Sequence, residues 1–254
     1  MDTSLTLLAP ALVHKAGGTL LRSGCVSKLP EFLLMYLVFV FSTTFHEFAH
    51  AWVARRGGDD TAYLGGHVTL DPTPHIRRSP LGMVLIPIFS YLQAGWMIGW
   101  ASVPFDPRWG SRYPLRQALM SLAGPAANFL LATIALVALR AMIGAGIFQI
   151  PIRGPHLIAL PEGVSWSSPL AALGFGLSNM FELNIVLGLF NLIPLPPLDG
   201  AGVAEGVAPR LLGGLYGKLR EVPMIELLGV LAASALFSEY AGPLVWAALR
   251  LLYV

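Results

Sequence analysis

An uncharged apolar run that leads straight into two histidines constrains this chain more than any other feature. Residues 32–41 read FLLMYLVFVF, and the pentapeptide HEFAH follows at 46–50. A helix needs about 20 mainly apolar residues to cross a bilayer. The run therefore predicts a membrane helix over 31–53 that carries ionisable residues near its C-terminal end. Such residues are expensive in hydrocarbon, so they point to a functional site.

The composition places the whole chain in a lipid bilayer. Of its 254 residues, 55% are hydrophobic and only 12% are charged, whereas soluble domains carry about 25% charged residues. We therefore expect an all-α, multi-pass integral membrane protein. The net charge of +2 is too small to indicate nucleic acid as a partner. Cys25 is the single cysteine, which excludes an intramolecular disulfide and a cysteine-based zinc cluster.

Hydropathy divides the rest of the chain into further apolar segments. Two clear spans are predicted at 118–143 and 170–193. Segment 81–100 is broken by Pro87 and several glycines, so it is either a kinked span or a re-entrant hairpin. Segment 224–254 is one last span or a short hairpin. We expect a bundle of about four to six transmembrane helices.

Two segments are expected to lie outside these spans. The apolar stretch in residues 1–30 is shorter than a span needs, so this part is predicted to be a non-spanning lead-in to a single domain over 31–254. Residues 62–70 combine glycines with β-forming residues. This pattern predicts a small membrane-associated β element.

The basic residues indicate an orientation. Cytoplasmic loops of membrane proteins carry an excess of lysine and arginine. Three loops that should share one side of the membrane contain most of the basic residues after position 30 (Arg55, Arg56, Arg77, Arg78, Arg108, Arg112, Arg116, Arg210, Lys218 and Arg220). This side should be cytoplasmic, and it is the side toward which both HEFAH and Asp199 are predicted to lie.

The HEFAH pentapeptide has the spacing of a zinc-binding motif. His46 and His50 are four residues apart, so on a helix they share one face and can hold one Zn²⁺ together. A catalytic zinc usually has three protein ligands and one open position. Asp199 is the best third candidate because it is an acid in apolar surroundings after a proline-rich stretch. Asp199 could instead be a turn residue before Gly200, and Glu182 is an alternative ligand.

The same motif supplies the residues of a hydrolytic reaction. A water on the zinc would have its pKa lowered to about 7. Glu47 would take its proton as general base and later pass it to the leaving amine as general acid. Asn128 and Asn191 lie near membrane level and could bind substrate or a developing oxyanion, or could simply join helices. His67 and His75 are interpreted as structural or surface residues.

Three blocks of sequence, taken in order, resemble those of a known family. They are HEFAH at 46–50, GPAAN at 124–128 and NLIPLPPLDG at 191–200. The chain resembles the site-2 proteases, which are intramembrane zinc metalloproteases, from about residue 31 to 204. The resemblance is to the compact bacterial branch without PDZ or CBS domains.

The resemblance implies specific roles for residues. His46, His50 and Asp199 would be the zinc ligands, Glu47 the catalytic base, and Asn128 a residue that lines the site. The segment at 62–70 would form the membrane-associated sheet of the family, whose edge can pair with an extended substrate.

The implied activity is hydrolysis of a peptide bond in or near a transmembrane segment of another membrane protein, with one Zn²⁺ per chain. The expected location is the bacterial inner membrane, with the active site toward the cytoplasm and with a regulatory partner protein. A metal transporter or silent scaffold is the first alternative, and a zinc peptidase on a membrane anchor is the second. Glu47 separates these readings, because a hydrolase needs this carboxylate and metal binding does not.

Overall fold

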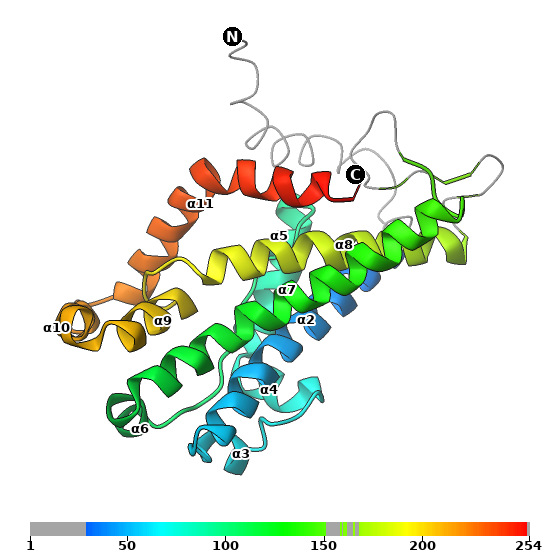
Figure 1. Cartoon of the computed structure of the whole chain (residues 1–254). Helices are drawn as coiled ribbons and strands as arrows, with labels where there is room; N and C mark the ends of the chain where they lie inside the picture. Colours follow the sequence, from blue (N-terminus) through cyan, green and yellow to red (C-terminus); the bar gives the residue numbers. More distant parts are fainter. Residues whose placement is uncertain (1–28, 151–157, 159, 162–164, 166–167, 253–254) are drawn as a thin grey trace, which may run out of the picture.

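Three long apolar helices form the body of the molecule. The computed structural model describes residues 29–150, 158, 160–161, 165 and 168–252. Helices α2 (Leu29–Arg56), α7 (Pro114–Gly144) and α8 (Pro169–Asn191) run side by side (Figure 1). All three are long and apolar enough to cross a membrane. They match the three main predicted spans, while the predicted lead-in lies almost wholly outside the described residues.

Helix α11 (Ile225–Arg250) adds a fourth candidate span. It bends by 62° between its first part, Ile225–Phe237, and its second, Gly242–Arg250. Pro243 lies in the second part, and a proline removes a helical hydrogen bond and kinks the helix. Counted as one span, α11 brings the number of candidate spans among the described residues to four. Four is the low end of the predicted four to six, and the prediction of an all-α, multi-span protein is confirmed.

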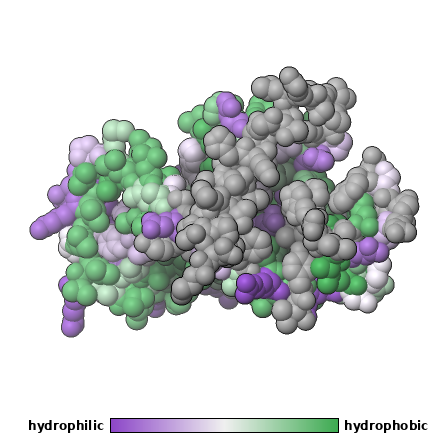
Figure 2. All heavy atoms as spheres, turned by 90° about the horizontal axis from the view of Figure 1, so that it is seen from above, coloured by the Kyte–Doolittle hydropathy of each residue, from purple (hydrophilic) through white to green (hydrophobic). Residues whose placement is uncertain are grey.

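The outer faces of the bundle are apolar, as contact with lipid requires. Leu37 on α2, and Leu130 and Val137 on α7, are each more than half exposed. Among the coloured atoms of Figure 2, apolar residues gather at the left of the view, with polar residues at their margin. Exposed apolar patches of this extent are not typical of water-soluble monomers.

Small residues set the close spacing of the helices. A Cβ added at Gly188 of α8 would lie 2.8 Å from the Phe129 ring of α7. Helix α9 (Asp199–Val207) approaches α7 in the same way, because a Cβ at Gly202 would lie 2.3 Å from Ser121 Oγ. Such close backbone approach is how helices pack in membranes.

Segment 81–100 forms a hairpin. Helices η2 (Leu81–Leu85) and α5 (Ile86–Ala94) are together too short to span a bilayer. The chain turns at Gly95, which has a φ of +69°. It then returns, and the Trp100 backbone N–H donates to the Gly82 carbonyl at 3.1 Å. The structure thus favours the re-entrant hairpin over the kinked span.

The β element predicted at 62–70 was wrong. Thr61–Leu64 forms the short helix α3, and turns follow through residue 70. The Asp59 carboxylate accepts a 2.9 Å hydrogen bond from the Thr61 backbone N–H, and the His67 N–H donates back to the Ala62 carbonyl. These local hydrogen bonds and the positive φ of Gly66 close the chain into turns, and they outweigh the β propensity of the side chains.

Residues 99–106, further along the chain, have no regular secondary structure and are called the extended segment here. A Cβ at Gly99 would lie 2.5 Å from the Phe39 ring of α2, so the segment starts beside the middle of that helix. It ends where the Asp106 N–H donates to Asp59 Oδ2 at 2.8 Å, just past the end of α2. The extended segment therefore follows the part of α2 that carries HEFAH (Figure 1).

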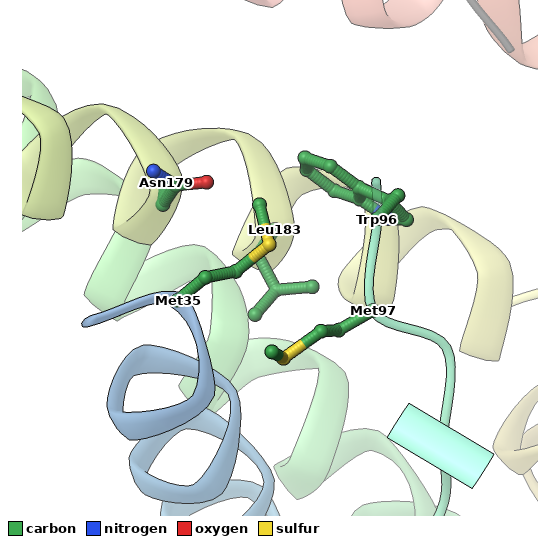
Figure 3. Close-up of a pocket in the computed structure, with 5 residues that line it drawn as sticks. All are labelled: Met35, Trp96, Met97, Asn179 and Leu183. Carbon is green, nitrogen blue, oxygen red and sulfur yellow. The ribbon is translucent and has the colours of Figure 1, made fainter. Parts of the chain in front are cut away.

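The remaining helices are short and lie at the ends of the long ones. They are α4 (Pro72–Arg78), α6 (Pro107–Arg112) and α10 (Pro209–Arg220). A small apolar gap also remains between the start of α2, the turn after α5 and the middle of α8. Five side chains line this gap, namely Met35, Trp96, Met97, Asn179 and Leu183 (Figure 3).

Replacing Gly82 by alanine should destabilise the protein. The new Cβ would lie 2.2 Å from the Trp100 carbonyl oxygen, where it has no room. We expect a loss of about 1–3 kcal/mol in the free energy of unfolding, seen as a lower Tm in detergent. Gly213→Ala in α10 is the control, because nothing lies within 4 Å of its Cβ position. An equal Tm for the two variants would contradict the hairpin packing.

Candidate metal centre

Side chains from α2 and α9 converge on one point. His46 Nε2 and His50 Nε2 lie 2.9 Å apart. The Asp199 carboxylate faces both, with Oδ2 3.1 Å from His46 Nε2 and Oδ1 3.2 Å from His50 Nε2. Among the described residues, these three side chains form the one group of three or more that could hold a metal ion. Asp199, the third ligand chosen from sequence, is thus brought to the histidine pair, and Glu182 is not part of this cluster.

The proline-rich segment before Asp199 delivers its carboxylate to the site. Helix α8 ends at Asn191, and α9 begins at Asp199 after seven residues without regular helix. A Cβ at Gly200 would lie 2.3 Å from the Leu192 carbonyl oxygen, so glycine allows α9 to start directly against the end of α8. Asp199 is therefore the first residue of a helix rather than part of the unwound stretch. A carboxylate at a helix N-terminus is favoured by the helix dipole.

The other nitrogen of each histidine fixes where its proton lies. His46 Nδ1 is 2.6 Å from Asn128 Oδ1, and His50 Nδ1 is 2.7 Å from the Met120 carbonyl oxygen. Both partners are acceptors, so each Nδ1 must carry the hydrogen. Each Nε2 then presents a bare lone pair toward the other and toward Asp199.

This donor set fits a metal ion. The two Nε2 atoms lie 2.9 Å apart, and each lies within 3.2 Å of one oxygen of the Asp199 carboxylate, in a place where both histidines are buried. One shared proton could satisfy only two of them, whereas a cation satisfies all three. A tetrahedral zinc with bonds of about 2.0–2.2 Å would hold its ligand atoms about 3.3–3.5 Å apart, close to the separations found. Two imidazoles and a carboxylate also match the ligands of known catalytic zinc sites.

Gly124 provides the space in which the imidazoles meet. A Cβ at this position would lie 2.3 Å from His50 Nε2 and 2.5 Å from His46 Nε2. Helix α7 therefore passes the two Nε2 atoms at a distance that only glycine permits. Sequence reasoning identified the GPAAN block but did not assign this role to its glycine.

Glu47 is next to the ligands but is not one of them. Its side chain is buried, and its carboxylate has no hydrogen-bond or ion-pair partner among the described residues. A buried carboxylate without a protein partner is free to bind a water or a substrate proton. This is the arrangement that a general base needs.

The two asparagines predicted to bind substrate have different surroundings. Asn128 is fully buried, and both ends of its amide are engaged, by His46 and by Asn184 Oδ1 at 2.7 Å. Asn191 ends α8 and donates to the Leu187 carbonyl at 3.0 Å. Contact of either residue with substrate stays a prediction. The observed contacts of Asn128 show that it orients His46.

His67 and His75 form a separate pair away from the metal centre. Their ring centroids are 5.4 Å apart and both side chains are buried, which agrees with a structural rather than a surface position. Burial, together with the neighbouring His75 and Arg78, lowers the pKa of His67. The His67 imidazole is therefore neutral near pH 7.

The fold and the site together define a membrane protein of the zinc metalloprotease class. The model of peptidase family M50 matches residues 34–181. The chain belongs to this family, which is the site-2 protease family. As a member, it is a zinc metalloprotease.

Curated relatives agree with this assignment. YwhC of Bacillus subtilis, named as a candidate zinc metalloprotease, is 38% identical over 187 residues, which are 71% of this chain and 72% of that protein. Rip2 of Mycolicibacterium smegmatis, named in the same way, is 30% identical over 71% of this chain and 59% of its own length. Rip2 of Mycobacterium tuberculosis strain H37Rv is 26% identical over 95% of this chain and 82% of its own length. No solved structure matches this chain.

Gly124→Ala should prevent metal binding. The added methyl group would occupy the space beside both Nε2 atoms, so the imidazoles could not converge on one ion. We expect zinc content in detergent-purified protein to fall well below one ion per chain. Gly144→Ala in the same helix, with nothing near its Cβ position, should bind zinc like the wild type. Full zinc content in Gly124→Ala would contradict the site geometry.

Proposed function

We propose that this zinc metalloprotease hydrolyses peptide bonds in or near transmembrane segments of other membrane proteins. The observation that carries the proposal is the position of the His46, His50 and Asp199 cluster. Two of its ligands lie on α2, which is apolar and long enough to span a membrane. A soluble substrate would have little access to a site placed there. The alternative of a zinc peptidase on a membrane anchor would need a hydrophilic catalytic domain, whereas this cluster lies on the span itself.

Each residue of the site has a chemical task in this proposal. Zinc, when bound by His46, His50 and Asp199, would supply Lewis acidity toward a water and toward the scissile carbonyl. The Glu47 carboxylate accepts a proton from the attacking water and later gives it to the leaving amine. Asn128 holds the His46 ring through its 2.6 Å hydrogen bond.

The extended segment at 99–106 is the proposed docking strand for the substrate. The backbone N–H groups of residues 101–103 and 105 have no hydrogen-bond partner among the described residues, and Ser102 and Phe105 are exposed. Seven extended residue steps cover about 23 Å, and the 17 steps of α2 from Phe39 to Arg56 cover about 26 Å. The segment at 99–106 is therefore about as long as the part of α2 that includes HEFAH.

Pairing with this strand would solve a problem specific to helical substrates. The amide carbonyls of a transmembrane helix are already hydrogen-bonded, so the segment must unwind before hydrolysis. Unwound backbone in hydrocarbon needs new partners, and a free strand edge supplies them. The role first predicted for 62–70 is therefore assigned to 99–106.

The proposed orientation puts the active site toward the cytoplasm of a bacterial cell, at the inner membrane. Arg55 and Arg56 end α2 beyond the metal ligands, and Arg116 lies in the first turn of α7. The Arg116 guanidinium donates to the Gly57 carbonyl at 2.9 Å, so these basic residues gather at one end of the bundle. The positive-inside rule assigns this end to the cytoplasm. A regulatory partner protein remains part of the proposal by family analogy.

Two substitutions separate a protease from a metal transporter or a scaffold. Glu47→Gln should keep one zinc per chain, because Glu47 is not a ligand, and should lower cleavage about 10²- to 10⁴-fold by removing the general base. Asp199→Ala should lose both zinc and cleavage. The probe is an apolar transmembrane peptide with a central Gly-Pro pair and terminal fluorophores, reconstituted in vesicles. Zinc-loaded Glu47→Gln that cleaves at the wild-type rate would sink the hydrolase mechanism.

Disulfide cross-linking tests the docking strand. In a Cys25→Ser background, Ser102→Cys should cross-link to peptide cysteines at every second position, because strands have a period of two. Leu211→Cys on α10, also highly exposed, should not show this pattern. Cross-links to Ser102→Cys at every third or fourth position would mean that the substrate stays helical there, which contradicts strand pairing.

A further inference from the structure

A chain of buried hydrogen bonds leads from the metal centre across all three long helices. Asn128 on α7 contacts His46, and its amide Nδ2 donates to Asn184 Oδ1 on α8 at 2.7 Å. Asn184 Nδ2 in turn donates to Ser42 Oγ on α2 and to the Met180 carbonyl, both at 2.8 Å. Asn128, Asn184 and Ser42 are each 0% exposed. Asn184 does not itself contact His46, His50 or Asp199, and the proposed reaction does not use it.

The direction of every bond in this chain follows from one backbone carbonyl. The Met180 carbonyl can only accept, so the NH₂ end of Asn184 must face it. Asn184 Oδ1 then faces Asn128, which turns the NH₂ end of Asn128 toward Asn184. Asn128 Oδ1 is left facing His46 Nδ1, and this nitrogen must carry its hydrogen.

The orientation of the Asn128 amide decides whether His46 Nε2 can bind a metal. A metal-binding imidazole offers a bare nitrogen, and the hydrogen bond at its other nitrogen sets which one is bare. If the Asn128 amide turned over, its NH₂ would face His46 Nδ1, and the hydrogen would move to Nε2. His46 would then point an N–H group at the ion in place of a lone pair.

We propose that Asn184 is a positioning residue that locks the amide of Asn128 and thereby keeps His46 Nε2 free for the metal. The inference rests on the proposed zinc site. It assigns Asn184 a role in metal affinity, at a distance of two hydrogen bonds from the ligand. Removal of partners that orient a ligand typically weakens metal binding about 10- to 100-fold.

The plainer reading is that Asn184 only joins helices, as buried amides do in membranes. The two readings differ in what they predict. A joining residue contributes to stability, and its loss lowers the Tm without a specific effect on zinc. A residue that locks Asn128 affects zinc affinity even where the fold is intact, and a replacement that keeps the lock restores that affinity.

The test compares zinc affinity in four variants by competition with a chelator, with the visible absorption of Co²⁺-loaded protein as a second readout. Asn184→Leu removes the hydrogen bonds to Asn128, Ser42 and the Met180 carbonyl. Asn184→Ser can still donate to the Met180 carbonyl, so this carbonyl keeps its side-chain hydrogen bond, but serine is too short to reach Asn128. Asn184→Asp, protonated in its buried site, can accept from Asn128 and donate to Ser42. Asn179→Leu is the matched control, because the Asn179 side chain is also buried in α8 and, among the described residues, donates only to the Phe175 carbonyl of the same helix.

We expect zinc affinity to fall about 10- to 100-fold in Asn184→Leu and Asn184→Ser, with altered Co²⁺ absorption. Asn184→Asp and Asn179→Leu should stay within about threefold of the wild type on the same scale. If Asn184→Leu does not fold, Asn184→Ser carries the test.

Three outcomes overturn the inference. They are wild-type affinity in the folded Asn184→Ser variant, an equal loss in Asn184→Asp and Asn184→Ser, and an equal loss in the Asn179→Leu control. As long as the wild-type protein binds zinc, none of these outcomes affects the proposed function. A wild-type protein that binds no zinc would overturn both.

Discussion

The central physical constraint in this structure is that three lone-pair-bearing groups, two imidazoles and one carboxylate, are held close together in a buried place, where they repel one another. His46 and His50 present bare Nε2 atoms to each other at 2.9 Å, and the Asp199 carboxylate faces both. In a low-dielectric interior such a group is stable only with a cation among its members. The hydrogen bonds at the two Nδ1 atoms keep the imidazole hydrogens on Nδ1, so neither ring can reduce the repulsion by moving its hydrogen to Nε2. A metal ion bound between the three groups would relieve this repulsion, so the fold favours metal binding at this place.

The other features of the fold meet the spatial conditions for this cluster. Glycine at 124 lets α7 pass beside the two imidazoles, and glycine at 200 lets α9 begin against the end of α8. The prolines at 194, 196 and 197 interrupt the helical path so that Asp199 can enter from a separate element. Glu47, next to the candidate ligands, has no hydrogen-bond or ion-pair partner in the part of the chain that the structure describes. The division of labour between ligands, space and free carboxylate is that of a hydrolytic metal site, which agrees with membership of the site-2 protease family.

Sequence alone could predict what depends on periodicity and composition. The long apolar runs were enough to place the three main spans. The spacing of His46 and His50 and the isolated acid at 199 were enough to select the three residues that the fold brings together, because helix geometry fixes which residues share a face. The β element predicted at 62–70 was wrong, because local hydrogen bonds from the Thr61 and His67 N–H groups to Asp59 and Ala62 fix that segment as a short helix and turns. The roles of Gly124 and Asn184 could not be predicted, since they depend on which side chains meet across helices. A polar residue in the middle of a span, as at 184, was the available signal.

The most direct test of the central claim is X-ray absorption spectroscopy at the zinc edge on the zinc-loaded wild-type protein. The account predicts two imidazole ligands and light oxygen scatterers at about 2.0–2.2 Å, with no sulfur at about 2.3 Å. Loss of one imidazole from the spectrum in His50→Ala would assign the ligands to this cluster. A sulfur ligand, or a wild-type spectrum without two imidazoles, would contradict the site built from His46, His50 and Asp199.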